Sequence, residues 1–448
     1  MKRKIYQEML DWKNSSNGKM ALLIEGARRI GKSYIVEKFA HNEYKSAIIV
    51  DFNDMQTDLR GIFDEYLSQR DEFFMRLSLY FGVKLYERES IIVFDEVQQY
   101  PKARAAIKYL VKDGRYDYIE TGSLISIKKN VKDIVIPSEE EHLEMYPMDF
   151  EEFLWALGDE MYVDFMRDCY KKQKPLGGFL RRGMDYLRLY MVVGGMPQAV
   201  KQYVDTKDFE QTDRIKRNIL RLYREDIAKY AFEAETKVTR IFDEIPSQLQ
   251  KHEKKFRLSA LGSNIKMRDY ADAFFWLDDA KIVNTCYNST EPNIGLRLNT
   301  DRTTLKCYLC DTGLLISMAF DKETIEREQL YKKLILDKLE FNQGMLVENL
   351  VAQMLRANGH NLFFFSSSDK VAENRMEIDF LLAKKSLTSR HNIIPVEVKS
   401  SSRYTHISID KFRRKYSEYI DMPIVFHPGD LKIEDKILYL PLCMAAVV

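Results

Sequence analysis

The sequence predicts an α/β protein whose N-terminal part is a parallel β-sheet with helices on both faces. Short apolar runs alternate with amphipathic helical stretches from residue 1 to about residue 147, which is the pattern of parallel strands joined by crossover helices. The run at residues 91–94 is continuously apolar, as expected of a strand that is buried on both faces. Strands are expected at residues 21–25, 47–52, 91–94, 118–120 and 143–146, and Pro147 marks the end of this part.

The first expected strand leads into a glycine-rich segment, Gly26-Ala27-Arg28-Arg29-Ile30-Gly31-Lys32-Ser33, which fits the pattern G-x-x-x-x-G-K-[ST]. Residues 33–40 continue with helical spacing, so the order is strand, loop and helix. The glycines let the backbone wrap closely around phosphates, and the helix start adds aligned N–H donors. A chance match in a glycine turn is disfavoured because both flanks are of the required type. We therefore predict that residues 26–33 bind ATP, with Lys32 on the β- and γ-phosphates and the Ser33 hydroxyl on Mg²⁺.

Two acids, Asp95 and Glu96, follow the apolar strand at residues 91–94. Asp95 is predicted to hold Mg²⁺ and Glu96 to polarise the attacking water, which is the division of labour that phosphoryl transfer needs. Adjacent acids also end ordinary strands, so this prediction depends on the phosphate loop. The next strand ends at Thr121-Gly122-Ser123, whose hydroxyls are predicted to sense the γ-phosphate, although the same residues are common in turns. ATP is predicted rather than GTP because no Asn-Lys-x-Asp segment that would read guanine is present.

The length, charge and cysteine content of the chain limit the number of its domains and the kinds of partner it can have. The chain has 448 residues, which is enough for three or four domains of ordinary size. Its 69 basic and 68 acidic residues leave a net charge of +1, so contact with nucleic acid would have to come from local patches. Five scattered cysteines do not form a disulfide framework, which favours a reducing compartment. With no apolar segment long enough to span a bilayer and no signal core at residues 1–8, we expect a cytoplasmic protein without a membrane partner.

The middle of the chain is predicted to be mostly helical. Residues 148–246 read as amphipathic helices and are expected to form a lid. Within them, Gly194-Gly195-Met196-Pro197 is a turn that opens a helix, where Pro197 is predicted to contact adenine, although a plain helix connection is the alternative.

Residues 247–330 indicate a winged helix-turn-helix. They read as three short helices, a strand at 281–287 and a hairpin of 294–298 with 304–309. Arg257, Lys266 and Arg268 would make its recognition region basic and able to bind DNA, but winged helices also serve protein contacts.

The last part, residues 331–448, contains a second set of candidate catalytic residues. Glu397 and Lys399 share one face of the strand expected at 393–399, Asp379 lies on the preceding strand, and Glu348 lies on a helix before both. This spacing is similar to that of PD-(D/E)xK nucleases, in which three carboxylates bind Mg²⁺ and the lysine positions the nucleophile. The alternatives are a strand with polar residues facing water and a catalytically silent binding module.

Taken together, these segments resemble bacterial and archaeal AAA-type ATPases that carry a C-terminal domain of unknown function. The resemblance implies an additional-strand P-loop core at 1–147, a helical lid at 148–246, a winged helix at 247–330 and a restriction-endonuclease-like end at 331–448. The Gly-Gly-x-Pro turn is similar to that of signal-transduction ATPases with numerous domains, in which the proline packs on adenine. Ile136 and Pro137 stand where many relatives have Gly-Arg, so an arginine finger would have to come from elsewhere, such as Arg28, Arg29 or Arg224.

Two functions are therefore open. The first is a nucleotide-driven ATPase switch that acts on nucleic acid, with an Mg²⁺-dependent nuclease site at Glu348, Asp379, Glu397 and Lys399. The second is a regulatory, signalling-type ATPase whose nuclease-like part is silent and binds protein partners. The complete carboxylate and lysine set favours the first function, whereas the near-neutral charge favours the second. Either is compatible with an oligomer.

Overall fold

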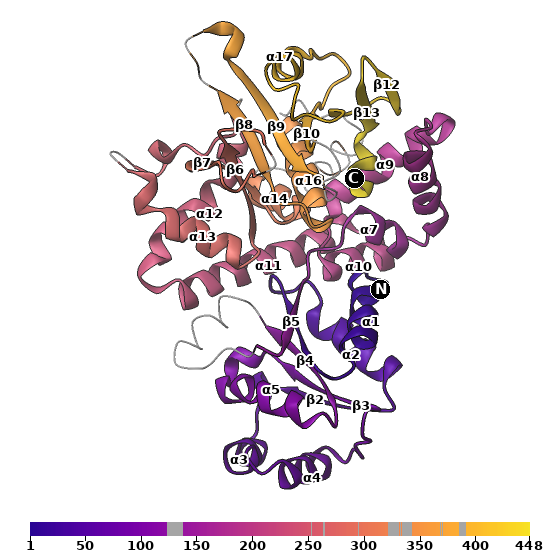
Figure 1. Cartoon of the computed structure of the whole chain (residues 1–448), viewed down its shortest axis with the longest axis vertical. Coiled ribbons are helices and arrows are strands. Elements are labelled where there is room, and N and C mark those ends of the chain that lie inside the picture. The colour runs from indigo at the N-terminus through magenta and orange to yellow at the C-terminus, as the bar shows by residue number, and fades with distance from the viewer. Residues whose placement is uncertain are drawn as a thin grey trace. The chain divides into compact units, whose positions relative to one another are not determined.

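The computed structural model describes the chain except for residues 123–137, 252, 263–264, 294, 321–330, 332, 334–342, 368, 370 and 385–390. The chain divides into two compact units, Met1–Tyr146 and Pro147–Val448 (Figure 1). In the part that is described, each unit is built around one β-sheet.

The first unit has a parallel sheet in the order β2-β3-β4-β1-β5. β4 lies between β1 and β3, so an additional strand separates the strand before the phosphate loop from the strand that ends in Asp95. The predicted α/β fold with a parallel sheet is confirmed. The strands are β1 (Ala21–Glu25), β2 (Ser46–Asp51), β3 (Ser90–Asp95), β4 (Asp117–Gly122) and β5 (Glu140–Glu144).

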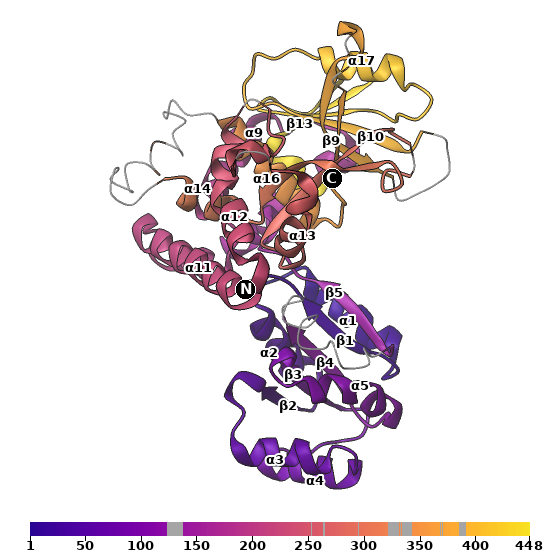
Figure 2. The ribbon, with the colours of Figure 1, turned by 90° about the vertical axis from the view of Figure 1, so that its left-hand side faces the viewer.

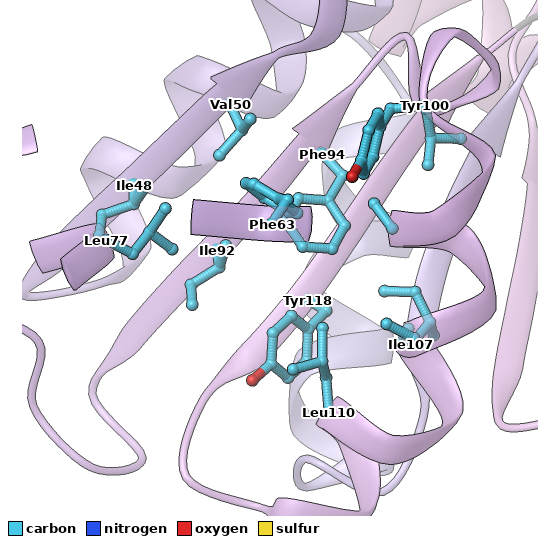
Figure 3. Packing of buried hydrophobic residues seen from close by; sticks show 14 of the residues in the cluster. Ile48, Val50, Phe63, Leu77, Ile92, Phe94, Tyr100, Ile107, Leu110 and Tyr118 are labelled. Atoms are coloured by element: carbon cyan, nitrogen blue, oxygen red, sulfur yellow. The ribbon is translucent and has the colours of Figure 1, made fainter. Parts of the chain in front are cut away.

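Helices on the two faces of this sheet bury its apolar residues. Figure 3 shows one such core, in which Phe63, Ile107 and Leu110 of the helices pack on Phe94 and Tyr118 of the strands. Burial of each large apolar side chain stabilises the fold by about 1.5–3 kcal/mol, so this core holds β3 and β4 against the helices. The helices are α1 (Ile5–Ser16), α2 (Lys32–Glu43), α3 (Thr57–Tyr66), α4 (Arg70–Phe81) and α5 (Pro101–Asp113).

The second unit combines helices with a mixed sheet. Residues 148–246 are helical, as expected, and helix starts are set by local capping: the Asp149 carboxylate accepts from the Glu152 N–H and the Asp311 carboxylate from the Leu314 N–H. The helices are α7 (Phe150–Ala156), α8 (Glu160–Lys172), α9 (Leu180–Val193), α10 (Pro197–Thr206), α11 (Phe209–Tyr230), α12 (Glu235–Gln250), α13 (Ala271–Asp279), α14 (Thr312–Ala319), α16 (Gln343–Ala357) and α17 (Ile407–Lys415).

The sheet of this unit has the order β12-β13-β11-β10-β9-β8-β6-β7. Figure 2 shows α17 on one side of these strands and α16 on the other, and Ile409 and Phe412 of α17 are buried in the sheet's apolar cluster. The strands are β6 (Val283–Ser289), β7 (Thr300–Leu309), β8 (Phe363–Ser367), β9 (Met376–Ala383), β10 (Ile393–Val398), β11 (Ile424–His427), β12 (Lys432–Glu434) and β13 (Ile437–Pro441).

The hairpin expected at 294–298 and 304–309 is wrong in its first strand. Residues 295–299 form a turn, because the Asn293 side-chain oxygen accepts from the Gly295 N–H and the Asn299 amide. β7 pairs instead with β6, and both belong to the same sheet as β8 to β13. Of the three short helices expected before them, the structure has two 3-10 turns, Leu258–Ala260 and Met267–Asp269, and α13. The division of residues 148–448 into lid, winged helix and nuclease-like domain stays a prediction.

Candidate functional site

The glycines of the phosphate loop are required by the backbone. Gly26 follows β1, and a Cβ there would lie 2.3 Å from the Met145 carbonyl oxygen and 2.5 Å from Ile30 Cδ1. Gly31 has φ of 93° and stands directly before α2. The loop can therefore approach phosphates closely and end in the free N–H groups of a helix.

Lys32 lies against the loop that precedes it. Its ammonium donates to the Gly26 and Ala27 carbonyl oxygens at 2.9 and 3.0 Å, and its residue is 6% exposed. These bonds hold the charge at the loop, where phosphate oxygens would replace the carbonyls as its acceptors.

The loop is also held from outside by Arg3. The Arg3 guanidinium donates to the Ile30 carbonyl oxygen at 2.8 Å and to the Tyr146 carbonyl oxygen at 2.6 Å, and the residue is buried. It thereby joins the phosphate loop to the segment after β5. Sequence reasoning missed this contact, because a single basic residue near the N-terminus forms no motif.

Asp95 connects the phosphate loop to the neighbouring strand. At the end of β3, its Oδ1 accepts from the Ser33 hydroxyl at 3.0 Å and from the Thr121 hydroxyl. The two predicted Mg²⁺ ligands, Ser33 and Asp95, are thus in direct contact, and Thr121 is beside them. Ser123 lies outside the described residues.

Glu96 has an unusual backbone conformation. Its φ and ψ are 54° and 47°, a left-handed conformation that costs energy in a residue other than glycine and recurs at functional sites. The Glu96 N–H donates to the Thr121 hydroxyl oxygen at 3.1 Å, and the Gln98 amide donates to the Glu96 carboxylate. The Gln98 amide therefore orients the partly exposed Glu96 carboxylate, and the bond to Thr121 holds the Glu96 backbone, as a general base requires.

A buried ion cluster supports the strand that carries Thr121. The Arg104 guanidinium of α5 contacts the Glu120 carboxylate at 3.0 Å and the Glu140 carboxylate at 2.9 Å, so that it links β4 to β5. Burial, the charge of Glu140 and its hydrogen bond outweigh Arg104 and raise the pKa of Glu120 well above its usual range. Sequence reasoning missed this cluster, whose members are separated by 16 and 36 residues.

The second candidate site lies where α16, β7 and β9 meet. The buried Lys306 ammonium contacts the Glu348 carboxylate at 3.2 Å, the Glu377 carboxylate at 3.0 Å and the Asp379 carboxylate at 3.5 Å. Lys254 forms a second ion pair with Glu348, and the Tyr308 hydroxyl also donates to it. Burial alone would raise the pKa of Glu348, but Lys306 and Lys254 lower it to about 2.

Glu397 and Lys399 form a separate ion pair beside this group. Their charged atoms lie 2.6 Å apart, and burial raises the pKa of Glu397 to about 7 in spite of Lys399. Asp379 accepts from the Val398 N–H at 2.9 Å, and it lies at an irregularity between β8 and β9 that redirects side chains. The four predicted residues are therefore neighbours in the fold.

The metal site predicted at Glu348, Asp379 and Glu397 stays a prediction. Within the described ranges, no group of three or more His, Cys, Asp or Glu side chains is placed to hold a metal ion. The physical reason is that Lys306 lies between Glu348 and Asp379, and Glu397 is paired with Lys399. Sequence reasoning missed Lys306, Lys254 and Glu377. Of these three, only Glu377 could have been found from the sequence, because it precedes Asp379 by two residues on one strand and so shares its face.

Comparison with known families assigns three regions of the chain. Residues 18–154 match the AAA domain family, residues 184–324 match Domain of unknown function (DUF8612), and residues 343–444 match Domain of unknown function (DUF4143). The chain thus carries an AAA domain at residues 18–154, followed by two regions that match domains of unknown function. No curated protein matches it.

Several solved structures are similar to this AAA-domain protein at low identity. A Walker-type ATPase of Pyrococcus abyssi is 15% identical over 71% of this chain and 96% of its own, with a TM-score of 0.41. AMPPCP-bound DnaA of Aquifex aeolicus is 10% identical over 62% of this chain and 80% of its own, with a TM-score of 0.29. Cdc6p of Pyrobaculum aerophilum is 12% identical over 76% and 96%, with a TM-score of 0.25.

Pro197 and the basic residues predicted to bind DNA belong to the second unit. Pro197 begins α10, directly after a turn that is tied down by a bond from the Gly195 N–H to Asp311, and its contact with adenine stays a prediction. Of the basic residues proposed to bind DNA, Arg257 pairs with Glu253 and Arg268 with Asp269.

All five cysteines are buried, and none forms a disulfide. None of the helices that the structure describes is both long and apolar enough to cross a membrane.

Proposed function

We propose that the AAA-domain protein hydrolyses ATP to ADP and phosphate and uses the cycle as a switch. The observation that carries this proposal is the Asp95 carboxylate, which the Ser33 and Thr121 hydroxyls share at the ends of neighbouring strands, with Glu96 as the next residue. The AAA domain match over residues 18–154 supports the same function.

The roles follow from the geometry. Lys32 exchanges its two carbonyl acceptors for oxygens of the β- and γ-phosphates. Mg²⁺, held by Ser33 and Asp95, would neutralise charge on the phosphates. Glu96 accepts a proton from the attacking water, and Thr121 positions that water beside the γ-phosphate.

The switch proposal rests on the bonds of Asp95. Mg²⁺ held by Ser33 and Asp95 would compete with the hydrogen bond between them, and Thr121 links Asp95 to the Glu96 backbone. The nucleotide state therefore changes the hydrogen bonding at the ends of β3 and β4. Such local rearrangements are a common source of nucleotide-driven motion.

The test is Mg²⁺-dependent ATP binding by calorimetry. Asp95→Asn and Ser33→Ala are expected to bind Mg²⁺-ATP about tenfold more weakly or worse, because each loses a ligand of the ion. Asp51→Asn is the matched control, since Asp51 ends β2 and pairs in register with Asp95, while its carboxylate accepts from the Asn53 N–H in the turn that follows β2. Equal affinity in all four proteins would contradict the assignment.

For the output of the switch, we propose that the second unit binds a protein partner and does not cut nucleic acid. Support comes from the ion pairs of Glu348, Glu377 and Asp379 with lysines, and from the acidic neighbours of Arg257 and Arg268. With Mg²⁺ or Mn²⁺, with or without ATP, we expect no cleavage of single-stranded or duplex DNA or RNA. Cleavage that disappears in Asp379→Asn would contradict the proposal.

A further inference from the structure

Three carboxylates of the second unit surround a buried lysine. Lys306 is 1% exposed, and its ammonium lies 3.0 to 3.5 Å from oxygens of Glu377, Glu348 and Asp379. These side chains come from β7, β9 and α16, so three elements of the fold converge on one buried amine. The face of the Phe364 ring lies 5.1 Å from the same ammonium.

The surrounding charges balance. Two further lysines reach the same acids: Lys254 pairs with Glu348, and Lys255 lies 3.6 Å from Glu377. Both are brought there by the chain segment that bridges to β7 at Lys255 and Lys306. Three carboxylates thus face three ammonium groups. A buried carboxylate without a partner is costly, so each of these lysines stabilises the cluster as it stands.

We propose that Lys306 takes the place that a divalent cation would otherwise fill among Glu348, Glu377 and Asp379, so that the second unit is closed to Mg²⁺ by its own chain. Entry of a metal ion would require the buried Lys306 ammonium to leave its three carboxylate acceptors. A cation that entered while Lys306 stayed would lie about 3 to 4 Å from the ammonium and would be repelled by its charge. This inference concerns the output half of the proposed function. Its failure would leave ATP binding by the first unit untouched.

The proposal makes a specific prediction about Lys306→Met. Methionine keeps an unbranched apolar stem but removes the ammonium group, which leaves the three carboxylates able to accept a divalent cation. We expect the full-length variant to bind one more Mn²⁺ ion than the wild type. Its affinity for Mn²⁺ at this site should be at least about 100-fold higher than that of the wild type. Lys306→Arg keeps the charge and is expected to bind no additional ion.

The experiment is a Mn²⁺ titration followed by electron paramagnetic resonance, without nucleotide. Lys432→Met is the matched control, because it removes a lysine from an exposed Lys432–Glu434 pair in the same sheet. The double variant Lys306→Met with Asp379→Asn is expected to lose the added ion, which assigns it to this cluster and not to the phosphate loop. Circular dichroism and thermal denaturation establish that each variant is folded, and Mn²⁺ is expected to raise the melting temperature of Lys306→Met alone.

Two results would overturn the proposal. One is a folded Lys306→Met that binds no more Mn²⁺ than the wild type. The other is a wild-type protein that already binds Mn²⁺ and loses it in Asp379→Asn. Should Lys306→Met fail to fold even with Mn²⁺, this wild-type comparison decides, because absence of an Asp379-dependent ion supports the closed site and its presence refutes it.

Discussion

Replacing Arg3 by alanine tests whether the phosphate loop is held in shape before nucleotide binds. The Arg3 guanidinium donates one hydrogen bond to Ile30 within the loop and one to Tyr146 after β5. Hydrogen bonds from a charged group contribute roughly 1.5–3 kcal/mol each, and the Ile30 and Tyr146 carbonyls would lose this donor. Arg3→Ala should therefore destabilise the first unit by roughly 3–6 kcal/mol.

Only the bond to Ile30 acts on the loop itself, so its value sets the effect on nucleotide binding. A loss of roughly 1.5–3 kcal/mol corresponds to an affinity for Mg²⁺-ADP that is about 10- to 100-fold weaker. Calorimetric titration with Mg²⁺-ADP measures the affinity, and thermal denaturation measures the stability. The exposed neighbour Lys2 supplies the control, since Lys2→Ala should change neither quantity.

Arg3→Lys separates folding from positioning. Lysine keeps the charge but cannot donate to both carbonyls with the geometry of a guanidinium, so an intermediate affinity is expected. The reasoning would be refuted by Arg3→Ala that is folded and binds Mg²⁺-ADP like the wild type. If Arg3→Ala does not fold, an unchanged affinity for Mg²⁺-ADP in Arg3→Lys would refute it equally.

Three further predictions concern the charged clusters. Lys32→Ala should lower the affinity for ATP by about 100-fold or more, because the contact to the β- and γ-phosphates is lost, and unchanged calorimetric affinity would sink the assignment. Arg104→Met should cost about 3–5 kcal/mol in denaturant unfolding at neutral pH, because the buried Glu120 and Glu140 side chains lose their partner. Burial raises the pKa of Glu120, so its contribution to stability is greatest at low pH and is lost as the pH rises from the ordinary glutamate value through the raised one. Glu120→Gln should flatten that dependence, and an unchanged pH profile would argue against it. The triple variant in which Arg257, Lys266 and Arg268 are changed to alanine should bind duplex DNA with the same affinity as the wild type. Fluorescence anisotropy at several salt concentrations measures this affinity.

The first unit was largely predictable because its signals are local. The residues of β1 and of the phosphate loop are contiguous, and each supplies its own evidence for a strand, a close turn or a helix start. The contact between Ser33 and Asp95 followed from the requirement that Mg²⁺ ligands meet. By contrast, the bonds of Arg3 to Ile30 and Tyr146 span 27 and 143 residues and have no sequence signature.

The second unit was less predictable because its site depends on long-range placement. Sequence spacing placed Glu348, Asp379, Glu397 and Lys399 in one predicted site, but it gave no sign that Lys306 would contact Glu348 and Asp379. The alternating pattern of a strand such as β7 predicts which residues share a face, but it does not predict which other elements that face contacts. The turn at residues 295–299 was read as a strand because Asn293 acts through side-chain hydrogen bonds, which an apolar pattern does not register.

ATP hydrolysis by Glu96→Gln tests the central claim most directly. The amide keeps the size of the side chain and can still meet Gln98, but it cannot accept the proton of the attacking water. Phosphate release is expected to fall by about 100-fold or more, while calorimetry shows Mg²⁺-ATP bound as tightly as by the wild type. Glu87→Gln, outside this site, should hydrolyse ATP like the wild type. Hydrolysis by Glu96→Gln at the wild-type rate would contradict the account.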